Sequence, residues 1–186
     1  MSPMQGLPRQ RSTSKPRSQR AGSGQLSVTR APSFKGLKPA SESSSRSMRG
    51  NRSKNTEPET LLRSELRSRG LRYRTHAAGL PGRPDLVFPA VRVVVFCDGD
   101  FWHGRNWRRL KQQLERRFNA AYWVAKIDRN RKRDRSQVAA LGRLGWHVLR
   151  YWEGDIRLSP QAVADRLQET LATYVTQPLS SGESSK

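Results

Sequence analysis

The chain has 186 residues, with 36 Lys and Arg against 15 Asp and Glu, which gives a formal charge of +21. This excess suits a polyanionic partner, either nucleic acid or an anionic membrane surface, and no apolar run approaches the roughly 20 residues that cross a bilayer. The single cysteine, Cys97, excludes an internal disulfide and a zinc site built from cysteines.

The first part of the chain, residues 1–47, consists mainly of Ser, Arg, Pro and Gly with few large apolar side chains. Such a composition buries too little surface to offset the entropy of ordering, so we expect a disordered tail. Counted through Asn55, it carries twelve Lys and Arg and one acid, Glu42. The tail can grip phosphates without reading sequence. A solubilising extension, or a start codon placed too early, explains it nearly as well.

A globular pattern follows, and we expect one domain over residues 48–175 and a second disordered tail over 176–186. The sequence TEPE predicts the start of a helix, with Thr56 as the N-cap and Glu59 at the capping-box position. Gly70 ends this helix. Three leucines give it an apolar face: Leu61, Leu62 and Leu66.

Three strands are predicted next, over Leu71–His76, Pro84–Phe88 and Arg92–Cys97. The short link Pro89-Ala90 joins the last two as a hairpin. Apolar alternation predicts which of their side chains are buried: Leu86, Phe88, Val93 and Val95.

In the second half of the domain, residues 105–119 are polar and weakly periodic, a pattern that predicts a loop with some helix. A helix is predicted over Tyr122–Gly142, a strand over Trp146–Trp152 and a last helix over Pro160–Tyr174. The apolar face of the first of these helices holds Val138, Leu141 and Leu144, opposite the charged run 128–135. The order αβββαβα predicts an α/β fold in which helices flank a mixed sheet.

Acidic side chains gather around two of the strands. Asp85 opens one strand, and Asp98, Asp100 and His103 follow the next. Close carboxylates are costly to bury unpaired, and a divalent cation is the commonest reason for such a group. A turn at Asp98-Gly99 and a surface position for Asp85 explain the pattern equally well.

Hydrolysis of a phosphodiester is one reaction that such a group can serve. Magnesium prefers one or two carboxylates, with water and phosphate oxygens in its other positions, and Asp85 with the hairpin end at residues 97–100 offers an open site of this kind. His103 is the best candidate for a general base, although capping a turn or pairing with an acid explains it slightly better. The capping box explains Glu59 fully, yet a helix N-terminus beside the sheet would also bring it to the metal. Two histidines among apolar strand residues are interpreted as structural: His76 and His147.

Aromatic side chains follow the acids at once. Phe101-Trp102 lies in a glycine-flanked loop, and Tyr122-Trp123 opens the next predicted helix. Beside a basic surface, such rings can insert between base pairs or stack on exposed bases. Core packing accounts for most aromatics, and we take it as the role of Trp146 and Trp152.

Five stretches, in order, carry a family resemblance: RSKNTEPE, LPGRPD, VVVFCDGDFWHG, YWVAKIDRNRKRDR and LGWHVLRYWE. Together they resemble the very short patch repair (Vsr) DNA endonucleases, which belong to the restriction-endonuclease-like PD-(D/E)xK nuclease superfamily. The resemblance covers roughly residues 48–153. The combination of PGRPD with the FWH loop is its most specific part.

The resemblance implies a fold, an activity and a set of site residues. Family members are magnesium-dependent nickases that cut beside a thymine mispaired with guanine. It implies that Asp85 binds Mg²⁺, that Cys97 offers its backbone carbonyl to the metal, and that Glu59 and His103 assist a metal-bound water. It also implies DNA-binding residues: the intercalating Phe101, Trp102 and Trp123, to which we add the basic Arg83 and Lys126.

The chain departs from the family at two places. Cys97 and Asp98 stand where well-known members have threonine and histidine, so we count Asp98 as an additional catalytic and metal-binding carboxylate. Asp100 replaces the first cysteine of the family's structural zinc site. We expect no structural zinc, and the loop with the aromatic pair must then be ordered by other contacts.

These observations predict a metal-dependent DNA endonuclease that hydrolyses a phosphodiester bond, of the Vsr type, nicking one strand at T:G mismatches in DNA repair. The alternatives are a related restriction or defence nuclease with another DNA substrate, and a catalytically silent DNA-binding protein. We expect a monomer acting on double-stranded DNA, with other mismatch-repair proteins as candidate partners and no membrane. Because the first residues lack the apolar segment of a secretory signal, we expect a cytoplasmic, nucleoid-associated protein.

Overall fold

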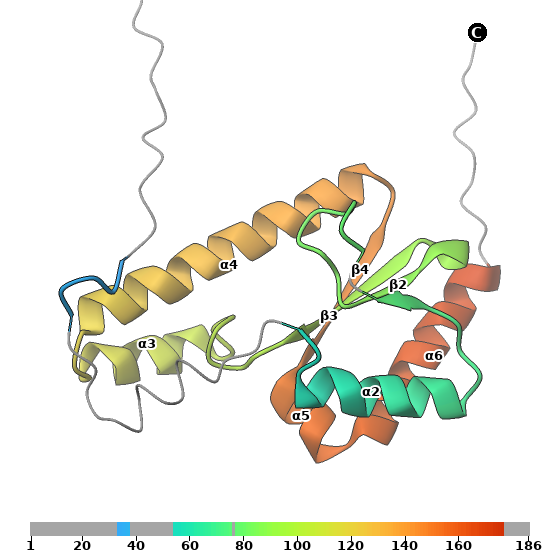
Figure 1. Ribbon diagram of the computed structural model, residues 1–186, viewed down its shortest axis with the longest axis horizontal. Coiled ribbons are helices and arrows are strands. Elements are labelled where there is room, and N and C mark those ends of the chain that lie inside the picture. The colour runs from blue at the N-terminus through green and yellow to red at the C-terminus, as the bar shows by residue number, and fades with distance from the viewer. Residues whose placement is uncertain (1–32, 38–53, 76, 177–186) are drawn as a thin grey trace, which may run out of the picture. The chain divides into compact units, whose positions relative to one another are not determined.

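The structure is a computed structural model that describes residues 33–37, 54–75 and 77–176 (Figure 1). Its four strands are β1 (Arg74–Thr75), β2 (Leu86–Phe88), β3 (Val93–Asp98) and β4 (His147–Trp152). They form one sheet in the order β1-β2-β3-β4. The first three strands pair antiparallel, and β4 pairs parallel to β3. This topology confirms the predicted mixed sheet.

In the described ranges, five α-helices and one short 3₁₀ helix surround the sheet. They are α2 (Glu57–Ser68), η1 (Pro89–Val91), α3 (Trp107–Glu115), α4 (Ala120–Arg143), α5 (Glu153–Leu158) and α6 (Pro160–Thr176). None of the helices in the described ranges is long and apolar enough to span a membrane.

Helix α2 begins as its sequence predicts. Thr56 is the N-cap and forms a capping box with Glu59, whose carboxylate accepts hydrogen bonds from the Thr56 backbone N–H and hydroxyl. The helix then buries Leu62 and Leu66 against the sheet. The local chain chemistry therefore fixes both the start and the buried face of this helix.

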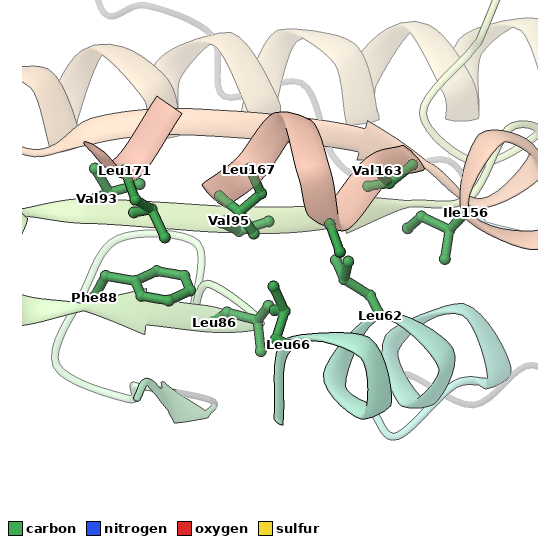
Figure 2. Packing of buried hydrophobic residues seen from close by; sticks show 11 residues of the cluster. Leu62, Leu66, Leu86, Phe88, Val93, Val95, Ile156, Val163, Leu167 and Leu171 are labelled. Carbon is green, nitrogen blue, oxygen red and sulfur yellow. The ribbon is translucent and has the colours of Figure 1, made fainter. Parts of the chain in front are cut away.

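The hairpin of β2 and β3 divides the core into two layers. Its register pairs Leu86 with Val95, and the 3₁₀ turn η1 closes it. Because strand side chains alternate in direction, one set packs with α2, α5 and α6 on one face of the sheet: Leu86, Phe88, Val93 and Val95 (Figure 2). All four are buried, as predicted. The other set packs with Leu141 of α4 on the opposite face: Val87, Val94 and Phe96.

The observed order is αβββααβαα. It contains two helices, α3 and α5, that the predicted order αβββαβα lacks. Helix α3 forms inside the stretch expected to be loop with some helix, and Leu114 is its buried residue. Helix α5 has only six residues and follows β4 directly, so it shows no periodic repeat, although Ile156 is fully buried. Strand β1 is shorter than predicted. Leu144 does not share the apolar face of α4, because it is the C-cap and is 50% exposed.

Most of both predicted tails lies outside the described residues, as does His76. Within the predicted N-terminal tail, residues 33–37 form a turn in which the Leu37 backbone N–H donates to the Phe34 carbonyl at 3.0 Å.

Candidate active site

Asp85 lies just before β2, and the hairpin register carries it to the end of β3. Its backbone N–H donates to the Val95 carbonyl at 3.0 Å, and its side-chain Oδ2 accepts a 2.7 Å hydrogen bond from the Cys97 backbone N–H. The turn before it places Gly82 and Arg83 at positive φ, 78° and 54°. At this φ any side chain at Gly82 would be strained, and it would also displace the end of the Gln137 side chain of α4, so this turn favours glycine.

The Asp85 carboxylate is held in an unfavourable environment for a charge. Burial raises its pKa to about 7, against the opposing effect of the Cys97 N–H, and the nearby Glu59 and Asp98 carboxylates raise it further. A cation beside Asp85 would relieve both the desolvation and the repulsion between the acids.

The donors at this point fit magnesium. A carboxylate and main-chain oxygens at a strand end are hard ligands, and Mg²⁺ takes one or two carboxylates and keeps several waters. Within the described ranges, no three His, Cys, Asp or Glu side chains converge as a ready-made metal cage. An open magnesium site does not require one.

Glu59 serves the capping box and also lies near the candidate metal position. It is 4% exposed, and one of its oxygens accepts from the Asn55 backbone N–H at 2.9 Å. Its charge acts on both Asp85 and Cys97. The capping function and the proximity to Asp85 are thus compatible, because Glu59 caps the first turn of α2 while its charge acts on Asp85.

His103 pairs with an acid that the sequence did not single out. Its Nδ1 lies 2.7 Å from Oδ2 of Asp134, a residue of α4 that is 6% exposed. Burial alone would raise the pKa of Asp134, but the hydrogen bond to His103 and the positive charge of Arg150 lower it. An ionised carboxylate only accepts, so Nδ1–H is the donor and Nε2 is the nitrogen that can take a proton.

Arg150 of β4 connects the remaining acid to this pair. It donates to both oxygens of Asp98, from Nη2 to Oδ1 at 2.7 Å and from Nε to Oδ2. The same guanidinium lies 3.3 Å from Asp134 and 3.3 Å from Nδ1 of His103. Asp98 is 2% exposed, and a bidentate ion pair holds it. The structure therefore pairs Asp98 with Arg150 and places its Oδ1 3.6 Å from Nδ1 of His103.

The loop between β3 and α3 carries the aromatic pair, and ion pairs order it. Arg105 donates to Asp100 at 3.4 Å and to Asp155 of α5 at 2.6 Å. Glu153 accepts from the Asp100 backbone N–H at 3.1 Å. Charged groups thus cross-link the loop to α5 at the position where the family resemblance implied a zinc ligand. The residues present do not fit zinc, since Asp100 is flanked by an arginine and no second cysteine exists.

Four rings form one surface cluster, which we call the aromatic cluster: Phe101, Trp102, Tyr122 and Trp123. Trp123 lies at its centre, with ring centroids 5.6 Å from Phe101 and 6.0 Å from Trp102. None of the four belongs to either core cluster, and each stays partly exposed. By contrast, Trp146 packs against the second core cluster and His147 stacks on Tyr174, as expected for structural residues.

The two predicted basic contacts lie on different elements. Arg83 is exposed in the turn just before Asp85. Lys126 is half-buried on α4, one helical turn after Tyr122. Their DNA-binding roles stay predictions.

Of the predicted site residues, the structure brings Asp85, Cys97 and Glu59 together at the hairpin end. It links His103 to Asp98 through Arg150, and it gathers the predicted rings into the aromatic cluster. The residues that the sequence analysis missed are Asp134, Arg150 and Arg105. Each is one charged residue in a chain that has 51, so its spacing alone carried no signal.

Comparison with known proteins places this chain in a family. The family model "DNA mismatch endonuclease Vsr" matches residues 38–109. The chain is 38% identical over 129 residues to the DNA mismatch endonuclease Vsr of Escherichia coli, covering 67% of this chain and 81% of that protein. It is 37% identical over 124 residues to a type II nicking enzyme of Neisseria meningitidis serogroup C, covering 67% of this chain and 82% of that enzyme. A type II nicking enzyme of Xanthomonas oryzae is 47% identical over 105 residues, which cover 56% of this chain and 75% of that enzyme. The chain therefore belongs to the Vsr DNA mismatch endonuclease family and is a DNA endonuclease.

Proposed function

We propose that the chain nicks one strand of duplex DNA with the help of Mg²⁺. The observation that supports this best is that two groups suited to this chemistry lie near the end of β3. One is a half-buried carboxylate, Asp85, with its pKa raised to about 7. The other is a histidine whose Nδ1 is held by Asp134.

The residues that would hold the metal are Asp85, through its carboxylate, and Cys97, through its main-chain carbonyl. When bound, Mg²⁺ supplies charge stabilisation to the phosphate that is being cleaved. His103 accepts the proton of the attacking water at Nε2, because Asp134 keeps the other nitrogen protonated. Glu59 helps to orient that water from the start of α2.

In this proposal Asp98 is a positioning residue and not the metal ligand that its place in the sequence led us to expect. The guanidinium of Arg150 already balances the charge of this carboxylate and would itself repel a nearby cation. Asp98 holds Arg150, whose guanidinium lies 3.3 Å from Asp134 and 3.3 Å from Nδ1 of His103.

The DNA substrate that we propose is a T:G mismatch in double-stranded DNA, as part of mismatch repair. The aromatic cluster supports it, because rings kept outside the core can enter a destabilised base step at low cost. Arg83 and Lys126 would contact the backbone. The protein would act as a monomer in the cytoplasm, beside the nucleoid.

A second candidate keeps the chemistry and changes the substrate. Two of the three relatives described above are named type II nicking enzymes, which favours nicking in a context set by a restriction and modification system. One experiment separates the two. Nicking is compared, with Mg²⁺ or EDTA, on two duplexes of otherwise identical sequence, one fully paired and one with a single T:G mismatch. Mismatch-dependent nicking supports the first candidate. Equal nicking of paired DNA supports the second, and intact DNA in every lane contradicts both.

A further inference from the structure

The turn at residues 33–37 has a defined local structure. The Leu37 backbone N–H donates to the Phe34 carbonyl at 3.0 Å, and the Lys35 backbone N–H donates to the Ser33 hydroxyl at 3.1 Å. Gly36, at the third position of the turn, has φ 85°, a conformation that glycine adopts without strain. The sequence SFKGL therefore encodes a turn that presents Phe34.

Phe34 packs on the aromatic cluster. Its ring centroid lies 5.1 Å from that of Tyr122 at an interplanar angle of 74°, and 6.2 Å from that of Trp123 at 51°. Edge-to-face contacts of this kind are favourable for aromatic pairs. Because Trp123 also contacts Phe101 and Trp102, Phe34 extends one continuous set of rings from four to five.

This fifth ring comes from a segment outside the family match, which begins at residue 38. The segment is strongly basic, since residues 1–37 contain seven Lys and Arg and no Asp or Glu. Lys35, next to Phe34, is exposed. A segment that kept DNA away from the aromatic cluster would be expected to carry acidic side chains, which repel phosphate. This segment carries only basic side chains, which attract it.

We propose that two residues of the turn, Phe34 and Lys35, are part of the DNA-binding surface, with Phe34 as an additional stacking ring and Lys35 as a phosphate contact. The inference rests on the proposed function, because it assumes that the aromatic cluster stacks on DNA. Its consequence is specific to this chain. The basic N-terminal segment is delivered to the DNA next to the bases that the cluster engages.

Two variants and a matched control test the proposal. Phe34→Ala removes the ring, Phe34→Trp keeps one, and Leu37→Ala truncates an apolar side chain of the same turn that is 37% exposed. Binding to a labelled T:G duplex is measured by fluorescence anisotropy in EDTA, which prevents cleavage. We expect Phe34→Ala to weaken binding about 5- to 100-fold, the range for loss of one stacked base, while Phe34→Trp and Leu37→Ala bind like the unaltered protein.

A photocrosslinking residue at position 34 should become attached to the duplex, and the same residue at position 37 should label it far less. Equal affinity of Phe34→Ala and Leu37→Ala, or tighter binding by Phe34→Ala, overturns the inference. Nicking by the unaltered protein is measured on the same preparation with Mg²⁺. If that nicking is present while Phe34→Ala binds normally, only the role of the turn is refuted; if it is absent, the proposed function itself fails.

Discussion

Replacing Asp85 by Asn should stabilise the metal-free protein while removing its metal-dependent activity. Asparagine has nearly the same shape, and its side-chain oxygen can still accept the hydrogen bond from the Cys97 N–H. It carries no charge, so it avoids both the desolvation of the carboxylate and the repulsion from Glu59 and Asp98. A carboxylate that lowers the stability of the metal-free protein is expected of a metal ligand, because function and stability often conflict at such sites.

The magnitude follows from the pKa. In the unfolded chain Asp85 ionises near 3.8, and in the folded protein at about 7. Because the folded state holds this proton more tightly, the contribution of Asp85 to stability is greatest at low pH and falls as the pH rises from 3.8 to 7. At 1.36 kcal/mol per unit, the loss is about 1.5 kcal/mol at pH 5 and about 4 kcal/mol at pH 8. The carboxyl is only partly enclosed, so both values are upper bounds.

Urea denaturation in EDTA at pH 5 and pH 8 measures this effect. The gain in unfolding free energy of Asp85→Asn over the unaltered protein should be about 2 to 3 kcal/mol larger at pH 8 than at pH 5. Asp128→Asn, which removes a surface carboxylate paired with Lys132, serves as the control and should show no such pH-dependent gain. Added Mg²⁺ should stabilise the unaltered protein at pH 8 and leave Asp85→Asn unchanged. A gain that is the same at both pH values, or a loss at pH 8, would refute the reasoning about Asp85.

Substitutions at three further residues test the neighbouring groups. Asp134→Asn should lower the single-turnover nicking rate about 10- to 100-fold with little change in DNA affinity, because it disturbs the tautomer of His103. Arg105→Gln should weaken DNA binding several-fold, as it releases the loop from Asp155, while Arg105→Lys should keep part of the affinity; equal binding by all three proteins would show that the ion pairs do not order the loop. Trp102→Ala should cost about 1 to 3 kcal/mol of binding free energy if the ring stacks on a base, whereas a fall in thermal stability without a loss of affinity would make it a packing residue.

Much of the scaffold could be predicted from the sequence because it depends on neighbours along the chain. The capping box of Thr56 and Glu59 spans three residues, and the hairpin that brings Asp85 to Cys97 spans twelve. Alternating apolar residues likewise predicted the buried set of β2 and β3. Interactions over such short separations leave a readable pattern.

The support of His103 could not be predicted in the same way. Asp134 is 31 residues from His103, and Arg150 is 52 residues from Asp98. Asp134 also lies in the charged run of α4, and the sequence does not distinguish this buried acid from its exposed charged neighbours. The parallel pairing of β4 with β3 sets Arg150 opposite Phe96, two residues before Asp98, and α4 supplies Asp134 from a separate element. Helix α5 was missed because six residues are too few to show a helical period.

The central claim is that Asp85 and its neighbours cleave one strand of duplex DNA with a divalent metal. Its most direct test is a single-turnover assay of a T:G-mismatched duplex, with each strand labelled separately, for the unaltered protein and for Asp85→Asn over a range of Mg²⁺ concentrations. We predict that the unaltered protein cuts one strand with a rate that saturates in Mg²⁺, and that Asp85→Asn binds the duplex but does not cut it. Cleavage by Asp85→Asn at the normal rate, or cleavage by the unaltered protein in EDTA, would contradict the account.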